Sequence, residues 1–415
     1  MQLTSPTGED IRLVHWISRA FRETPAKIGI AVSGGGDSMA LLHLFARWSA
    51  KTGHPIAAVT VDHGLRDGSD REAAGVAKYC AEIGVPHEVL LWQDWDGHGN
   101  LQAVARDARY RLMADWAQRN GVGAIALGHT KDDGAETYVM RLSRKAGVDG
   151  LAAMDTEFER GGMRYARPLW MTSRKELRDY LTRNDVKWVE DPSNYDVDFE
   201  RVRVRKALTE LEGLGLGADA LQHSSIVMRQ ARDALEYYTA QEARRLVVAE
   251  GADLIMPHKP DVPEEIARRL RAKAIGWMGH MPYPPRLTSM QHLMEGLSLE
   301  GTHTLGGAIV TLKDGQLRFM RELNAVRTKV CKTTEIWDGR WAIDGPHADD
   351  LQVRALGEGI ADCAGWRETG LPRVSLMASP AIWRGDHLVS APLAGYAQGW
   401  AARIVADYHS SLVTH

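Results

Sequence analysis

The chain has 415 residues, of which 44% are hydrophobic and 25% charged, and its formal net charge is −3. This length predicts two or three domains, because a single hydrophobic core rarely serves more than about 250–300 residues. The near-neutral charge argues against a surface that is basic throughout, so any contact with nucleic acid must depend on local basic patches.

The cysteines and the N-terminal segment indicate the compartment. Cys80, Cys331 and Cys363 lie far apart without zinc-binding spacing, and their odd number argues against a disulfide framework. Glu9 and Asp10 stand where a secretory signal would need an apolar core. No segment has the length and apolarity of a membrane helix. We therefore expect a cytoplasmic protein that makes no membrane contact.

The first 210 residues or so alternate short apolar runs with longer amphipathic stretches. Strands are predicted over residues 27–32, 57–61, 88–92 and 124–127, and helices over residues 38–50, 71–83, 100–120 and 135–144. This alternation predicts an α/β fold with a doubly wound, mostly parallel, Rossmann-like sheet. Ligands of such sheets bind beyond the carboxyl ends of the strands, where this chain carries SGGGDS, DHGLRDGSD and GHTKDD.

The pattern changes near residue 216. Helices are predicted over residues 218–250 and 263–277, and a hairpin over residues 301–322 turns at Asp314 and Gly315. Short alternating runs then predict a small β-rich module. We expect a catalytic domain over residues 1–215, a helical and hairpin middle region over 216–325, and a C-terminal module of unassigned role over 326–415.

A glycine-rich loop follows the first strand and consists of Ser33, Gly34, Gly35, Gly36, Asp37 and Ser38. Consecutive glycines let backbone N–H groups approach an anion, and the helix that begins near Asp37 adds its positive dipole end. Neither the Walker A pattern nor the dinucleotide fingerprint fits this loop. The alternative is a tight turn in which Asp37 only caps the helix.

Further candidate residues follow the same sheet edge. Asp133 and Glu136 lie three residues apart at a helix start and therefore share a face, where they can hold an ammonium group or a metal, or accept a proton. Their alternative role is helix capping. Arg109, in a predicted helix, is suited to a phosphate or a base edge, or to a surface salt bridge. We interpret His63 and His129 as loop-shaping residues, because no third metal ligand is spaced to join them.

Two basic clusters are candidates for contact with nucleic acid. They comprise Arg141, Arg144 and Lys145, and Arg201, Arg203, Arg205 and Lys206. The arginines of RVRVRK would share one side of an extended backbone and follow a row of phosphates, whereas a helix would spread them apart. The alternative for either cluster is an ordinary charged surface.

The loop resembles the PP-loop of the N-type ATP pyrophosphatases. The motifs that follow are similar, in order and wording, to the tRNA(Ile)-lysidine synthetases of that superfamily. They are DHGLR, ARDARYRLMADWA, GHTKDDGAET, GLAAM, RPL, WVEDPSNYD and the FERVRVRK run, all within about residues 25–210. Gly134 departs from the family, which commonly has an amide or apolar residue there, and residues 143–147 vary an RGxG-like stretch.

The resemblance implies a ligase that uses ATP to adenylate oxygen 2 of the wobble cytidine in a CAU-anticodon isoleucine tRNA. Free L-lysine then displaces AMP at carbon 2 to give lysidine. The resemblance also implies that Asp37 binds a bridging Mg²⁺, that Arg109 meets the activated nucleotide, and that Asp133 and Glu136 serve the lysine and metal half of the site. It further implies that the middle region over residues 216–325 and the two basic clusters contact this tRNA. The sequence leaves open a homodimer.

Three other classes use or mimic such a loop. A tRNA thiolase generally needs paired cysteines, and Cys80 has no partner in the sequence. Small-molecule amidating synthetases would not explain the run from EDPSNYD to RVRVRK. An inactive RNA-binding protein would not need the intact loop together with Asp133 and Glu136.

Overall fold

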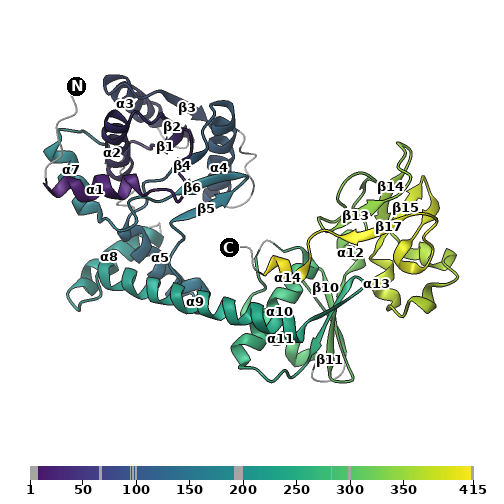
Figure 1. Ribbon diagram of the computed structural model, residues 1–415. Helices are drawn as coiled ribbons and strands as arrows, with labels where there is room; N and C mark the ends of the chain where they lie inside the picture. Colours follow the sequence, from purple (N-terminus) through teal and green to yellow (C-terminus); the bar gives the residue numbers. More distant parts are fainter. Residues whose placement is uncertain are drawn as a thin grey trace. The chain divides into compact units, whose positions relative to one another are not determined.

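The computed structural model describes residues 8–64, 68–93, 95, 98, 101–190, 200–281, 283–297 and 301–412. Its contacts divide the chain into two compact units, Met1–Arg232 and Asp233–His415 (Figure 1). The boundary falls within helix α9 (Ala218–Leu246). Across the described residues, no helix is long and apolar enough to cross a membrane. The division into three parts at residues 215 and 325 stays our proposal.

In the first unit, six strands of the described chain form one sheet in the order β3-β2-β1-β4-β6-β5. They are β1 (Ile28–Ala31), β2 (Ile56–Asp62), β3 (His87–Leu91), β4 (Ala124–Ala126), β5 (Glu157–Arg160) and β6 (Met163–Ala166). All neighbours pair in parallel except β5, which pairs antiparallel with β6. The mostly parallel sheet and its four predicted strands are confirmed, and the β5–β6 hairpin adds an edge that the sequence analysis did not predict.

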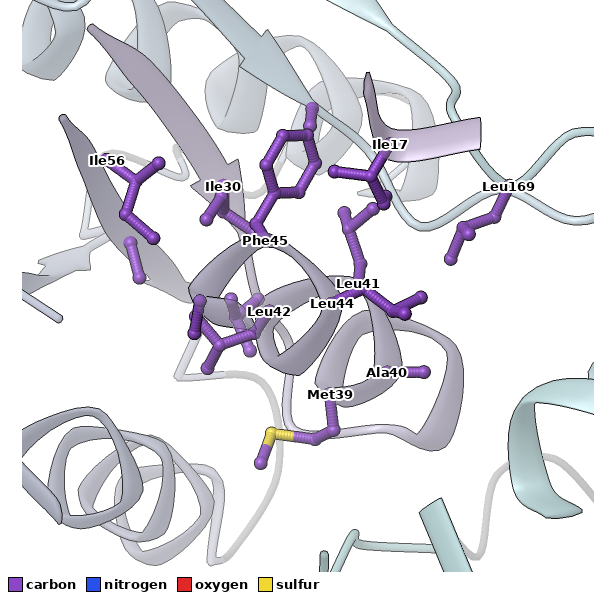
Figure 2. Close-up of a cluster of buried hydrophobic side chains, with 14 of the residues drawn as sticks. Ile17, Ile30, Met39, Ala40, Leu41, Leu42, Leu44, Phe45, Ile56 and Leu169 are labelled. Atoms are coloured by element: carbon purple, nitrogen blue, oxygen red, sulfur yellow. The ribbon is translucent and has the colours of Figure 1, made fainter. Parts of the chain in front are cut away.

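Helices cover both faces of this sheet. The helices that precede α9 in the described chain are α1 (Gly8–Ser18), α2 (Gly36–Thr52), α3 (Ser69–Glu82), α4 (Leu101–Arg119), α5 (Lys131–Ser143), α6 (Val148–Leu151), α7 (Arg174–Arg183) and α8 (Glu200–Glu212). Of these, α1, α2, α3, α4 and α7 contribute to the hydrophobic clusters that pack on the sheet. One face packs on α1, α2, α3 and α7, and Figure 2 shows Phe45 of α2 between Ile30 of β1 and Ile17 of α1. The other face packs on α4, where a Cβ at Gly29 would lie 2.8 Å from the Trp116 ring. Strands buried on both faces explain the continuous apolar runs.

A buried polar network fixes α7 against α2. The Tyr180 hydroxyl lies 2.8 Å from His43 Nδ1, and Arg47 donates to Asp10 and to Asn184, each at 3.2 Å. Burial lowers the pKa of His43 to about 4, so its ring is neutral at physiological pH. The network places the beginning of α7 near the beginning of α2, at the carboxyl edge of the sheet.

In the second unit, an antiparallel sheet of described strands has the order β7-β8-β11-β10-β9. They are β7 (Val248–Glu250), β8 (Asp253–Pro257), β9 (Thr302–Leu305), β10 (Ala308–Lys313) and β11 (Gln316–Arg321), and they pack against α10 (Glu264–Gly279) and α11 (Leu287–Leu297). Asp314 and Gly315 both have positive φ, 50° and 71°, which confirms the predicted hairpin. The helix predicted to reach residue 250 ends at Leu246, because β7 begins two residues later.

The last part of the chain is rich in short strands, as predicted. They are β12 (Cys331–Lys332), β13 (Trp341–Asp344), β14 (Gln352–Ala355), β15 (Pro380–Arg384), β16 (His387–Ser390) and β17 (Ala401–Ile404). Short helices join them: α12 (Leu323–Val326), α13 (Arg373–Met377), α14 (Tyr408–Ser411), η2 (Gly357–Asp362), η3 (Trp366–Thr369) and η4 (Pro392–Ala394). Trp337, Trp341 and Trp400 form the centre of one of the two hydrophobic clusters here.

Candidate functional site

The glycine-rich loop connects the carboxyl end of β1 to α2. Gly34 has a φ of 88°, which favours glycine, and Gly35 is the N-cap of α2 without any side-chain capping bond. Ser38 Oγ donates to the Gly35 carbonyl at 2.9 Å and accepts from the Ser33 N–H at 3.1 Å. Asp37 lies in the first turn and does not cap the helix, so the capping alternative is wrong. The first N–H groups of α2 are left available to an anion.

A second loop, between β4 and α5, approaches the first closely. A Cβ at Gly128 would lie 3.1 Å from the Cα of Ser38 and 3.2 Å from the Asp37 carbonyl, so the approach depends on glycine. Thr130 then caps α5 and forms a capping box with Asp133. The local sequence therefore brings the Asp133 carboxylate to the same edge of the sheet as Asp37.

Three carboxylates from these two segments converge on one guanidinium, that of Arg174 at the start of α7. Arg174 Nε lies 3.3 Å from Asp37 Oδ2, Nη2 lies 2.7 Å from Asp133 Oδ1, and Nη1 lies 2.5 Å from Glu136 Oε1. This brings together Asp37, Asp133 and Glu136, as predicted. Arg174 itself was missed. The Ser173–Glu176 capping box signals where α7 begins, but no sequence signal shows what the Arg174 side chain contacts.

The Asp133 carboxylate has two functions at once. Its Oδ2 accepts the Thr130 backbone N–H at 2.8 Å, which is the capping role considered as an alternative, while its Oδ1 meets Arg174. Burial alone would raise the pKa of Asp133, but the Arg174 guanidinium, His129 and the Thr130 hydrogen bonds hold this pKa below its usual value. Asp133 is therefore ionised at neutral pH.

Glu136 is only 1% exposed and lies between two arginines. Its Oε1 accepts from Arg174 and also from Arg205 Nε, at 2.7 Å. Its Oε2 is buried and has no hydrogen-bond partner among the described residues; Arg201 Nε lies 3.9 Å away, beyond hydrogen-bonding distance. A buried carboxylate oxygen without a donor is costly, so this atom is suited to bind a cationic N–H group of a ligand.

The positive charge of Arg174 does not fully offset the cost of burying the Asp37 carboxylate. Burial raises its pKa to about 6; Arg174 opposes this rise, and Asp133 and Asp132 add to it. A bound cation would relieve this state. In the described part of the chain, no three His, Cys, Asp or Glu side chains gather to enclose a metal ion. Mg²⁺ commonly takes one or two carboxylates and otherwise phosphate and water, and the Asp37 carboxylate is compatible with this mode of binding.

Arg109 and the two histidines lie in the same domain. Arg109 packs over the Tyr110 ring at 5.4 Å, and its buried Nε has no hydrogen-bond partner in the described chain, where Arg109 also forms no ion pair. Its alternative as a surface salt bridge is therefore not supported. Arg167 Nε donates to His129 Nδ1 at 3.2 Å, and burial lowers the His129 pKa to about 3. His63 packs edge-on against Trp92, and burial lowers its pKa as well, so both rings are neutral at physiological pH. Their role in shaping the loops stays a prediction.

The basic run RVRVRK lies in α8, so the hypothesis of an extended backbone is wrong. The valine–arginine alternation has the period of a strand, but α8 packs against α5 as a helix and this contact decides the backbone. Arg201 and Arg205, four residues apart, face Glu136, whereas Arg203 and Lys206 lie on an exposed part of the helix. Trp188–Glu190 of the neighbouring motif is described, and the rest, with Phe199, lies outside the described residues.

The three residues of the other basic cluster, Arg141, Arg144 and Lys145, have different surroundings. Arg141 donates to the Gly150 carbonyl at 2.9 Å and the Ala152 carbonyl at 3.3 Å, which fixes the segment after α5. Arg144 pairs with Glu200 of α8. Lys145 is exposed. Of the three, Arg141 has the most evident structural role.

Gly134 departs from the pattern for a packing reason. A Cβ at this position would lie 2.5 Å from the Trp170 ring, which is only 2% exposed. Trp170 occupies the space that a larger side chain at position 134 would fill. Glycine at position 134 therefore makes room for the bulky Trp170 ring, and the site loses no charged group through it.

Residues 10–212 match the PP-loop domain family. A tRNA(Ile)-lysidine synthase from Ruegeria pomeroyi is 45% identical over 399 residues, which cover 95% of each chain. The tRNA(Ile)-lysidine synthase from Brucella suis is 32% identical over 93% of this chain and 90% of its own. A solved U34-tRNA thiolase, NcsA from Methanococcus maripaludis, has a TM-score of 0.46 and 16% identity over 54% of this chain and 78% of that one.

Proposed function

The chain belongs to the tRNA(Ile)-lysidine synthases, and we propose that it ligates free L-lysine to carbon 2 of the wobble cytidine in a CAU-anticodon isoleucine tRNA. ATP supplies the energy and leaves as AMP and pyrophosphate. The observation that supports this best is the site itself, where the glycine-rich loop leads into a helix without a side-chain cap and lies beside Asp133 and the buried Glu136 Oε2, which has no hydrogen-bond partner among the described residues. The glycine-rich loop suits a polyphosphate, and the Asp133 and Glu136 carboxylates suit an ammonium group.

In the first step, oxygen 2 of the cytosine attacks the α-phosphorus of ATP, and the bond to the β-phosphate oxygen breaks. This oxygen is a weak nucleophile, so catalysis depends on positioning and on stabilising the departing pyrophosphate. The N–H groups of Gly35, Gly36 and the first turn of α2 provide that stabilisation. Asp37 would hold a Mg²⁺ ion, and this ion would neutralise phosphate charge when bound.

In the second step, the lysine ε-amine attacks carbon 2 and the bond from carbon 2 to oxygen breaks, so AMP leaves with that oxygen. Glu136 Oε2 and the Asp133 carboxylate receive the lysine ammonium, and a carboxylate takes the proton that the amine must lose. Arg109 has an unpartnered Nε and meets the activated nucleotide.

The test is incubation of the protein with ATP, radiolabelled lysine and a tRNA transcript that carries the CAU anticodon. We expect label in the tRNA, with AMP formed in equal amount. The control transcript has uridine at the wobble position and should stay unlabelled. Unlabelled CAU transcript under conditions in which pyrophosphate is released would contradict the proposal.

The cysteines give a prediction against the thiolase alternative. Cys80, Cys331 and Cys363 are free, and burial raises the pKa of the Cys80 thiol to about 12, which leaves it a poor nucleophile. Replacing all three by alanine should keep lysidine formation within about twofold, with some loss of stability from the buried sites. Mass spectrometry of digested tRNA checks this. A thiolated nucleoside made by the wild type and absent from the variant would favour the thiolase.

The exposed side of α8 gives a second prediction. Arg203 and Lys206 are exposed, whereas Arg205 is engaged by Glu136, so Arg203→Glu/Lys206→Glu tests tRNA contact without altering that ion pair. If both residues contact phosphates, the slope of log affinity against log salt should fall by about 1.4–1.8. ATP affinity should stay unchanged.

The matched control is Lys51→Glu/Lys78→Glu, which makes the same charge change at exposed positions of α2 and α3. Filter binding over a range of salt concentrations measures both variants. Equal slopes for the wild type and the α8 variant would show that this face is ordinary surface. The arginines of α10 are a weaker second choice, because Arg268, Arg269 and Arg271 already pair with glutamates.

A further inference from the structure

Arg174 connects the two halves of the proposed site. Its guanidinium contacts Asp37 of the phosphate-binding segment and both Asp133 and Glu136 of the segment proposed to hold lysine. These acids belong to α2 and α5, and Arg174 belongs to α7. In the described chain, Arg174 is the residue that contacts all three acids.

The backbone at Arg174 is fixed as firmly as its side chain. The Arg174 N–H donates to Asp132 Oδ2 at 2.8 Å, and the Lys131 N–H donates to the Thr172 carbonyl at 3.0 Å. The beginnings of α5 and α7 are thus tied together by one hydrogen bond from the backbone to a side chain and one between backbone groups. Farther along α7, the Tyr180 hydroxyl lies 2.8 Å from His43 Nδ1 of α2, so α7 is tied to both segments that carry the acids.

From these contacts we propose that Arg174 is a positioning residue for the reaction: it holds the Asp37 carboxylate and the Asp133–Glu136 pair at fixed separation, so that the adenylated base forms within reach of bound lysine. The inference rests on the proposed function. It assigns Arg174 no contact with substrate. A planar guanidinium with several N–H donors can span three carboxylates, which the single ammonium of a lysine cannot.

The inference predicts a pattern that differs from simple loss of packing. Removing Arg174 leaves three acids of like charge close together, and Glu136 keeps Arg205 as its remaining close partner. The acids would separate, so both half-reactions should slow. A displacement of about 1 Å can cost about 100-fold in rate, and we expect kcat/KM for lysine to fall by about that factor in Arg174→Ala.

The experiment compares Arg174→Ala, Arg174→Gln and Arg174→Lys with Arg178→Ala, an exposed arginine one turn along α7 that pairs with Glu190. Pyrophosphate release and lysidine formation are measured separately, with and without millimolar guanidinium. We expect guanidinium to restore activity to Arg174→Ala in a saturable way, Arg174→Lys to stay well below the wild type, and Arg178→Ala to resemble the wild type. Circular dichroism establishes that each variant is folded.

Wild-type kinetics in folded Arg174→Gln would overturn the inference, as would a loss in Arg174→Ala that guanidinium leaves unchanged. If Arg174→Ala fails to fold, Arg174→Gln and Arg174→Lys decide the matter by the same two assays. A different result is expected if the proposed function, rather than the role of Arg174, is wrong. In that case the wild type itself forms no lysidine, while the effect of Arg174 on pyrophosphate release can still be measured.

Discussion

Asp37→Ala should release pyrophosphate about 100- to 1,000-fold more slowly than the wild type in the presence of tRNA, because it removes the carboxylate proposed to hold the Mg²⁺ that would neutralise charge on the departing phosphates. The carboxylate lies in the first turn of α2, and its side chain is 26% exposed. It contributes little packing, so the fold should be retained. A coupled assay for pyrophosphate measures the effect, and Asp179→Ala, an exposed acid on α7, is the matched control.

The same residue should show a trade-off between function and stability. Burial raises the pKa of Asp37 from 3.8 to about 6, so the folded state binds this proton more tightly than the unfolded state. The stability that the protonated acid gives is present below pH 4 and is lost as the pH rises through 6. Without Mg²⁺ and ATP, Asp37→Asn should therefore be more stable than the wild type at pH 7, by about 1–3 kcal/mol, and equally stable near pH 4.

Thermal unfolding at both pH values tests that trade-off. An Asp37→Asn protein that is less stable than the wild type at pH 7 would show that the carboxylate supports the fold. Pyrophosphate release at the wild-type rate from Asp37→Ala would remove Asp37 from the ATP site. The two results are independent, because one concerns the free protein and the other concerns catalysis.

The parts of the site that could be predicted are local in sequence. Strand β1, the glycine loop and α2 follow one another directly, so the backbone demands of Gly34 and Gly35 are visible in the residue types. Asp133 and Glu136 share a helix face by spacing alone. The sheet could be predicted because strands buried on both faces are continuous apolar runs between amphipathic helices.

The parts that could not be predicted depend on contacts between distant segments. Arg174 lies 137 residues from Asp37 and 38 from Glu136, and no local pattern shows that the three meet. The sequence RVRVRK has the alternation of a strand, yet the contact of α8 with α5 makes it helical. The β5–β6 hairpin was not predicted because its strands are short and only partly apolar. In RVRVRK, tertiary contacts override the local preference.

Glu136→Gln should slow the transfer of lysine while it leaves adenylation of the tRNA nearly unchanged. The substitution keeps the side-chain volume at a position that is 1% exposed, but it removes the charge that would receive the lysine ammonium. Because Asp37 and the loop are untouched, adenylation of the tRNA and pyrophosphate release should stay within a few-fold of the wild type. Transfer of lysine should slow by about 100-fold, the loss expected for one electrostatic group in a buried site.

Loss of the Glu136 charge also leaves Arg174 and Arg205 facing a neutral amide, and breaking a buried ion pair can cost about 3–5 kcal/mol of stability. The double variant Glu136→Gln/Arg205→Gln removes one of the two positive charges that Glu136 neutralised. It should regain part of the lost stability without regaining lysine transfer, so it distinguishes a catalytic loss from a folding loss. Rapid-quench measurement of adenylated tRNA and lysidine at limiting lysine, with thermal unfolding of each variant, follows both effects. If the folded Glu136→Gln enzyme transfers lysine as fast as the wild type, the carboxylate serves only to hold the two arginines, and the lysine site must be sought elsewhere along this edge of the sheet.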